Sequence, residues 1–111
     1  LRSYLRAEEY MQDHMDEVVD LVGENLDLTR ETAESFVLSP HMKYDTDPYT
    51  NSVRTMWEKM ADYGYLTEGD IKIDDHMNSD IYKRALESLI EEYPDSQFFK
   101  DKMAQFESNN T

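Results

Sequence analysis

The sequence predicts an all-α protein, an irregular bundle of four to five helices in a single domain of 111 residues. Only three glycines and three prolines are present, too few for a fold with many tight turns. Apolar residues recur at helical spacing in segments separated by short polar connections. Seven Met, eight Tyr, four Phe and one Trp are enough large side chains to build a core at this length.

The first helix is expected over residues 3–23. Acidic residues occupy most of its surface, and one apolar stripe runs along it. Gly23 closes the helix, or the helix extends as far as Asn25 before it frays. The stripe consists of Leu5, Met11, Met15, Val18, Val19 and Val22.

A second, short helix is expected over residues 30–38. Thr29 is a suitable N-cap, and Glu31 in the first turn favours the helix dipole. Pro40 cannot continue a helix and restricts the residue before it, so the helix ends there. A connecting loop follows over residues 39–47, in which Met42 and Tyr44 can still pack inward.

The third helix is expected over residues 48–63. Asp47 is a good N-cap residue, and Pro48 then occupies the first helical position, where proline is best tolerated. Residues spaced at i, i+3, i+4 and i+7 make one face apolar, which indicates packing on that side. These residues are Val53, Met56, Trp57 and Met60.

Gly64 supplies the left-handed residue that ends this helix. Tyr65 or Leu66 can then fold back onto the last turn. A turn is expected at residues 67–70, and residues 71–74 alternate apolar and polar side chains. Four residues make a marginal strand, so this stretch is expected to be extended coil.

The last two helices are expected over residues 79–93, ended by Pro94, and over residues 95–107, capped by Asp95 or Ser96. Each has a broad apolar face. The first presents Ile81, Tyr82, Ala85, Leu86, Leu89 and Ile90, and the second presents Phe98, Phe99, Met103 and Phe106.

The net charge of −14, from 25 acidic and 11 basic residues, excludes several classes of partner. Nucleic acids and anionic membrane surfaces require a basic surface, so neither is expected as a partner. The acidity fits a soluble, self-repelling surface, or else a docking site for a basic protein. There is no cysteine and therefore no disulfide framework or zinc–thiolate site. No run of about 18 apolar residues and no signal-peptide pattern occurs. The first residue already lies inside a helical pattern, so we expect the natural start to lie upstream.

Two acidic stretches are candidates for cation sites. The stretch that begins with Asp45 and Asp47 faintly resembles a calcium loop. Such a loop needs glycine at its sixth position and a bidentate acid at its twelfth, but Thr50 and Met56 stand there. A helix cap explains Asp47 better, and no calcium is expected.

The other stretch, residues 74–76, reads Asp-Asp-His just before a helix. Solvated residues near a helix N-terminus explain it better than a metal site, which would need further ligands. His14 has no second histidine on its helix and no HExxH pattern, and His41 lies alone in a loop. No metal and no cofactor is therefore expected.

No arrangement of residues indicates catalysis, so the chain is not expected to be an enzyme and no catalytic residue is assigned. Carboxylate pairs arise by chance in so acidic a chain, and adjacent residues on a helix do not share a face. Motifs for a serine nucleophile and for a phosphate-binding glycine loop do not occur. The methionines sit at core spacing and indicate core filling rather than a Met-rich binding surface. The carboxylate pairs are Glu8/Glu9 and Glu91/Glu92, and the methionines are Met11, Met15, Met56, Met60 and Met103.

The order of the segments resembles the C-terminal region of substrate-binding proteins of ABC importers. It is most similar to the aliphatic-sulfonate, nitrate, taurine and thiamine-precursor branch, which has the type-2 periplasmic-binding fold. Four pieces carry the resemblance, which extends to about Leu86; the last helix is less typical. The pieces are "YLRAEEYMQDHMDEVVDLVGENL", "DLTRETAESFV", "NSVRTMWEKMADYGYL" and "IKIDDHMNSDIYKRAL".

The resemblance implies a helical piece of a larger α/β binding protein whose two lobes are missing here. It implies an extracytoplasmic location, periplasmic or lipid-anchored at the cell surface. The implied partners are the remaining lobes, an ABC permease, and a small anionic or organic solute held mainly by the missing lobes. No ligand-binding residue can be placed on this chain, and isolated apolar faces would favour a homodimer. The alternative is a free-standing acidic helical module that binds other proteins.

Overall fold

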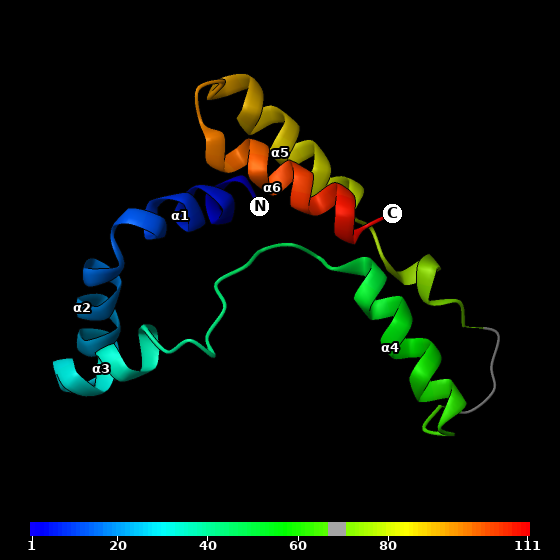
Figure 1. Ribbon diagram of the computed structural model, residues 1–111, viewed down its shortest axis with the longest axis horizontal. Coiled ribbons are helices and arrows are strands. Elements are labelled where there is room, and N and C mark those ends of the chain that lie inside the picture. The colour runs from blue at the N-terminus through cyan, green and yellow to red at the C-terminus, as the bar shows by residue number, and fades with distance from the viewer. Residues whose placement is uncertain (67–70) are drawn as a thin grey trace. The chain divides into compact units, whose positions relative to one another are not determined.

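The computed structural model describes residues 1–66 and 71–111, and all regular structure in these two stretches is helical (Figure 1). The predicted all-α class is confirmed. None of these helices is long and apolar enough to cross a membrane. In chain order the elements are α1 (Arg2–Asp13), α2 (Met15–Leu26), α3 (Arg30–Val37), α4 (Thr50–Asp62), the 3₁₀ turn η1 (Ile73–His76), α5 (Asp80–Glu92) and α6 (Gln97–Asn109).

The chain forms two compact units. The N-terminal unit comprises Ser3–Thr46, and the C-terminal unit comprises Leu1–Arg2 together with Asp47–Thr111. The N-terminal unit carries eleven acidic and three basic residues, a net charge of −8. It therefore holds more than half of the chain's charge of −14 in fewer than half of its residues.

The helices α2 and α3 pack against each other as the core of the N-terminal unit. Val19 from α2 meets Ala33 and Val37 from α3, and all three are buried. Tyr44 packs on this cluster from the following loop, and its hydroxyl donates a hydrogen bond to the carbonyl of Val37 (2.8 Å). The inward packing predicted for Tyr44 is confirmed, whereas Met42 is exposed.

The single helix predicted over residues 3–23 is wrong, because the chain breaks at His14. The first half, α1, ends at Asp13, and α2 then runs on past Gly23 to Leu26. Apolar periodicity continues through the break and gives no sign of it. The other four helices begin and end within two residues of their predicted limits.

The predicted cap of α3 is confirmed. The hydroxyl of Thr29 accepts a hydrogen bond from the backbone N–H of Thr32 (3.3 Å), which satisfies one of the free donors at the helix start. Replacing Thr29 with alanine should therefore destabilise the N-terminal unit by about 1 kcal/mol. Thermal unfolding followed by circular dichroism would measure the loss. Thr29→Ser is the matched control and should retain most of the stability.

The C-terminal unit has its core between α5 and α6, which form an antiparallel pair (Figure 1). Both helices bury most of the apolar faces that the sequence predicts, but Ile81 of α5 is 49% exposed. Tyr82 stacks on Phe106 with ring centroids 5.6 Å apart, and Phe99 meets Phe98 edge to face at 5.6 Å. The fully or nearly buried apolar side chains of this pair are Tyr82, Leu86, Leu89, Phe99 and Phe106.

The start of α4 differs from its prediction. Asp47 and Pro48 precede the helix, and the residue at the N-cap is Tyr49 in a left-handed conformation (φ 48°). The carboxylate of Asp47 accepts hydrogen bonds from the backbone N–H of Tyr49 (2.8 Å) and from the side-chain amide of Asn110 (2.9 Å). Asp47 is thus a link between the start of α4 and the end of α6.

The end of α4 follows its prediction. Gly64 is left-handed (φ 76°), and its N–H donates to the carbonyl of Ala61 (3.0 Å). The N–H of Tyr65 donates to the carbonyl of Met60 (2.9 Å). Together these two bonds make the Schellman motif that glycine favours at this place. The side chain of Tyr65 stays exposed and does not fold back.

The segment after α4 is only partly described. The turn predicted at residues 67–70 lies outside the described residues. The extended coil predicted over residues 71–74 is wrong in its second half, where η1 begins at Ile73. Asp74 in η1 pairs with Arg54 of α4 (2.5 Å), and this local contact favours the turn over an extended chain.

Candidate functional site

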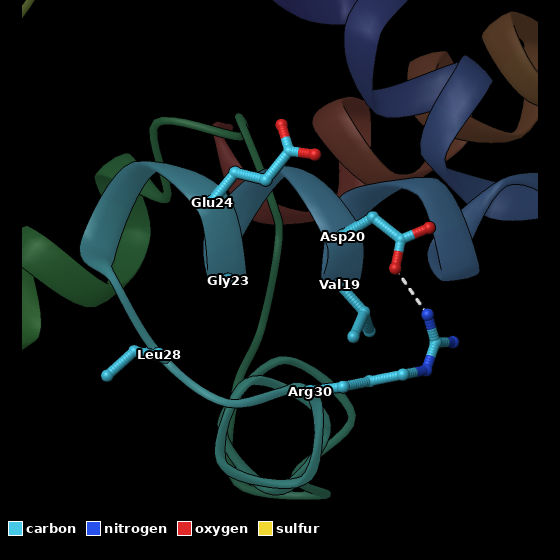
Figure 2. A pocket seen from close by; sticks show the side chains of 6 residues that line it. All are labelled: Val19, Asp20, Gly23, Glu24, Leu28 and Arg30. Carbon is cyan, nitrogen blue, oxygen red and sulfur yellow. Dashed lines mark hydrogen bonds and ion pairs between the residues drawn. The ribbon is translucent and has the colours of Figure 1, made fainter.

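A pocket of about 280 Å³ lies between α2 and α3 in the N-terminal unit (Figure 2). One side of α2 forms its wall, and the α2–α3 loop and the first residue of α3 complete it. The loop packs closely on Gly23, where a Cβ atom would lie 3.4 Å from the carbonyl oxygen of Leu28, a distance of ordinary van der Waals contact. The N–H of Leu28 in turn donates to the carbonyl of Gly23 (2.9 Å). The lining residues are Val19, Asp20, Gly23, Glu24, Leu28 and Arg30.

The positive charge of Arg30 in this pocket is neutralised by neighbouring carboxylates. The guanidinium of Arg30 is hydrogen-bonded to Asp20, as Figure 2 shows, and it also lies 3.4 Å from Glu34 and 3.7 Å from Asp16. Three carboxylates therefore surround one cation. The pairs are about half exposed, so they add little to stability. Their effect is to leave the pocket acidic overall, with apolar walls at Val19 and Leu28.

A second hollow, of about 390 Å³, lies in the C-terminal unit along α5. It is more basic than the first, because Arg2 and Arg84 both line it. Arg2 donates to the hydroxyl of Ser88 (2.9 Å) and pairs with Glu92, which fixes it along α5. The remaining lining residues are Leu1, Ile81 and Ala85.

The apolar stripe of α4 is only partly covered by its own unit, and of its four residues Trp57 is half-buried. Met56 is 64% exposed, and Val53 and Met60 are each 37% exposed. Core filling, predicted for the methionines, is therefore wrong for Met56, whereas Met60 is partly buried and Met15 packs on the N-terminal core. The stripe is apolar, but α4 meets α6 and η1 through other residues, such as Asn51 and Arg54.

The candidate cation ligands do not come together. Asp45 is exposed, whereas Asp47 is buried and bound to Asn110. Asp75 and His76 are exposed on η1, beside the Asp74–Arg54 pair. Within residues 1–66 and 71–111, no three His, Asp or Glu side chains are grouped so that they could hold a metal ion.

The paired carboxylates have separate environments. Glu8 is buried and accepts a hydrogen bond from the hydroxyl of Thr46 (2.5 Å), whereas Glu9 is half-buried. Glu91 and Glu92 are exposed, and Glu92 pairs with Arg2. Neither carboxylate pair lines the two pockets described above, and His41 is an exposed loop residue.

One further cluster, at the break between α1 and α2, is not predicted from the sequence. The rings of Tyr10 and His14 stack with centroids 3.8 Å apart and planes 4° from parallel. The hydroxyl of Tyr10 donates to the carboxylate of Glu17 (2.6 Å). The sequence contains one indication of this stacking: Tyr10 and His14 are four residues apart, and residues at that spacing share a helical face.

The hydrogen bond to Glu17 raises the pKa of the Tyr10 phenol above its ordinary value. A raised pKa means that the bond stabilises the folded chain below the ordinary pKa of tyrosine, near pH 10. This contribution is lost as the pH rises through the higher, folded-state value. A near-ultraviolet absorbance titration should therefore show one late-ionising tyrosine that disappears in Tyr10→Phe. In Glu17→Gln the same tyrosine should ionise earlier, and an unchanged titration would contradict the assignment.

Comparison with protein-family models, with curated proteins and with solved structures gives no match for this chain. Its function must therefore be inferred from the residues and their arrangement.

Proposed function

We propose that the chain is the helical C-terminal part of an extracytoplasmic solute-binding protein of an ABC importer. In this role it contributes scaffold for the capture of a small anionic or organic solute, which the lobes bind and deliver to a membrane permease. No covalent chemistry is required of its residues. The proposal starts from the similarity of four helix-and-cap segments to that family.

The observation that carries the proposal is the incompletely covered apolar stripe of α4. It lies in the segment "NSVRTMWEKMADYGYL", which is one of the four that resemble the family. An apolar helix face is ordinarily buried against another element. The stripe is incompletely covered within its own unit, since Met56 is largely exposed and Val53 and Met60 are partly exposed, while Trp57 is half-buried. Incomplete cover is expected of a segment that packs on lobes outside this chain.

The first test is the coding sequence on either side of this segment. An upstream signal peptide, followed by a sequence of alternating strands and helices long enough to form the two lobes, would support the proposal. A start codon directly before Leu1 together with a stop codon after Thr111 would overturn it.

A second test uses the stripe itself. Met56→Asp should leave the stability of the isolated chain nearly unchanged, within about 0.5 kcal/mol, because the side chain is largely exposed. In the longer protein the same change would bury a charge against the lobes and should lower the melting temperature clearly. Thr55→Asp, on an exposed position of the same helix, is the matched control. Equal effects of the two substitutions in the longer protein would contradict packing of lobes on the stripe.

The second candidate function is a free-standing acidic module that binds a basic protein segment. It is favoured by the acidic pocket between α2 and α3 within a unit of net charge −8. Calorimetry with a lysine-rich amphipathic peptide would test it. Binding should weaken as salt is raised and weaken further in Glu24→Gln, since surface charge attraction is screened. Equal binding of a glutamate-rich peptide of the same pattern would reject it.

A further inference from the structure

One face of α5 lines the basic hollow of the C-terminal unit. Four residues of this helix contribute at positions i, i+3, i+4 and i+7, a spacing that places them on one helical face. Leu1 and Arg2, which belong to the same unit, complete the lining. The hollow is therefore built within one unit, from side chains outside the buried α5–α6 core. The four residues of α5 are Ile81, Arg84, Ala85 and Ser88.

The first arginine of this hollow, Arg2, is already committed to the protein. Its guanidinium donates to the hydroxyl of Ser88 (2.9 Å) and pairs with the carboxylate of Glu92. The hydroxyl of Ser88 in turn donates to the carbonyl of Ala85 (2.9 Å). The charge of Arg2 is thus balanced, and these bonds fix one side of the hollow in place.

The second arginine, Arg84, is not committed. It makes no hydrogen bond or ion pair with any residue in 1–66 or 71–111. Asp80 and Glu87 lie about one turn to either side of it on α5, yet neither pairs with it. This is unusual for a chain with 25 acidic and only 11 basic residues. The other arginines that pair with carboxylates are Arg2, Arg30 and Arg54.

The lining therefore offers one uncompensated guanidinium together with apolar surface. The five N–H donors of Arg84 form a planar fork that matches a carboxylate. Ile81 and Leu1, both half-exposed, supply apolar side chains in the same hollow. The volume of about 390 Å³ is that of a site for a small molecule.

The charge of the surroundings favours a ligand with a single negative charge. The C-terminal unit has a net charge of −6, which is what remains of −14 after the −8 of the N-terminal unit. Arg84 can compensate one negative charge, whereas the second charge of a phosphate would meet the repulsion of this acidic surface. A carboxylate fits both the charge and the geometry of the guanidinium.

We propose that the hollow along α5 binds a small monocarboxylate that carries an apolar group. The carboxylate accepts two hydrogen bonds from Arg84, and the apolar group lies over Ala85, against Ile81 and Leu1. The dissociation constant should be on the order of 1 mM, because the ligand is small and much of the lining is exposed. The site uses side chains of the C-terminal unit alone, so it does not depend on the binding-protein role proposed above.

Nuclear magnetic resonance of the isotope-labelled full chain, titrated with 4-phenylbutyrate, tests the proposal. The backbone amides of residues 81–88 and the side-chain Nε–H of Arg84 should shift together and saturate. Two related compounds separate the contributions of charge and apolar contact. The uncharged 4-phenylbutanamide and the short carboxylate acetate should each bind at least about fivefold more weakly.

Substitutions then locate the site. Arg84→Gln should weaken the binding of 4-phenylbutyrate at least about fivefold. It should leave the chain folded, because the side chain it replaces is exposed and unpaired in the described residues. Lys83→Gln is the matched control: it removes an adjacent exposed charge that does not line the hollow, and it should change the affinity less than about twofold.

Three results would overturn the proposal. One is the absence of shifts in residues 81–88 at about 10 mM 4-phenylbutyrate, well above the expected dissociation constant. Another is equal binding of 4-phenylbutanamide, which would show that the carboxylate is not recognised. The third is an equal loss of affinity in Arg84→Gln and Lys83→Gln, which would assign the binding to general charge attraction.

Discussion

Replacing Phe99 with alanine is expected to destabilise the C-terminal unit by about 3–5 kcal/mol. Phe99 is fully buried between α5 and α6. Its ring also meets those of Tyr93 at 6.2 Å and Phe98 at 5.6 Å. Alanine would remove the buried apolar surface, leave a cavity and lose both ring contacts. Since small domains have stabilities of about 5–15 kcal/mol, this loss would remove a large share of the unit's stability.

Urea denaturation combined with amide hydrogen exchange in α5 and α6 would measure this effect. The matched control is Phe36→Ala, because Phe36 is also in a helix but is 51% exposed. That change should cost less than about 1 kcal/mol. A loss below about 1 kcal/mol for Phe99→Ala would show that the α5–α6 pair does not have this core.

The sequence predicted helix ends correctly where a capping residue or a glycine marks the end. Thr29 caps α3 through a hydroxyl three residues before its partner, and Gly64 ends α4 in a left-handed conformation. Most of the apolar faces of α5 and α6 is buried as the spacing indicates, with Ile81 as the exception. These features depend on residues within one or two turns of each other, so a single sequence is enough to find them.

Two predictions were wrong because they depend on contacts that local signals do not reveal: the continuous first helix and the N-cap role of Asp47. The break at His14 depends on side-chain bonds that replace a backbone bond, and apolar periodicity carries no information about such an exchange. The role of Asp47 depends on Asn110, 63 residues away, so the local pattern could indicate only a helix cap. In both places a side-chain hydrogen bond that the apolar pattern does not encode decides the local structure.

The apolar stripe on α4 shows a third feature that the sequence could not predict, namely what covers an apolar helix face. Its spacing correctly identifies an amphipathic helix, but the spacing does not say what lies against the apolar side. Met15 and Met56 both lie on the apolar stripe of a helix, yet Met15 packs on a core and Met56 is largely exposed. For the candidate site, the sequence could show that the α2 surface is acidic. The four-residue spacing of Arg30 and Glu34 is a local signal, but the sequence could not show that Arg30 would also meet Asp16 and Asp20 of α2.

Replacing Asn110 should loosen the contact that joins the two ends of the C-terminal unit. The side-chain amide of Asn110 donates to Asp47 (2.9 Å), and its oxygen accepts from the backbone N–H of Thr50 (2.8 Å). Asp47 and Thr50 are both buried, so each group would be left without its Asn110 partner inside the protein. Asn110→Ala is therefore expected to cost about 1–3 kcal/mol.

Asn110→Asp is expected to cost more than Asn110→Ala, although it keeps the shape of the side chain. The new carboxylate would still accept from Thr50, but its second oxygen would face the carboxylate of Asp47 in place of an N–H donor. Two like charges in a buried contact repel each other, and neither can be fully hydrated there. Thermal unfolding of Asn110→Asp, Asn110→Ala and the control Asn109→Asp should rank the losses in that order. If Asn110→Asp proved as stable as Asn109→Asp, Asp47 and Asn110 could not be in contact, and the start of α4 would have to be held by other residues.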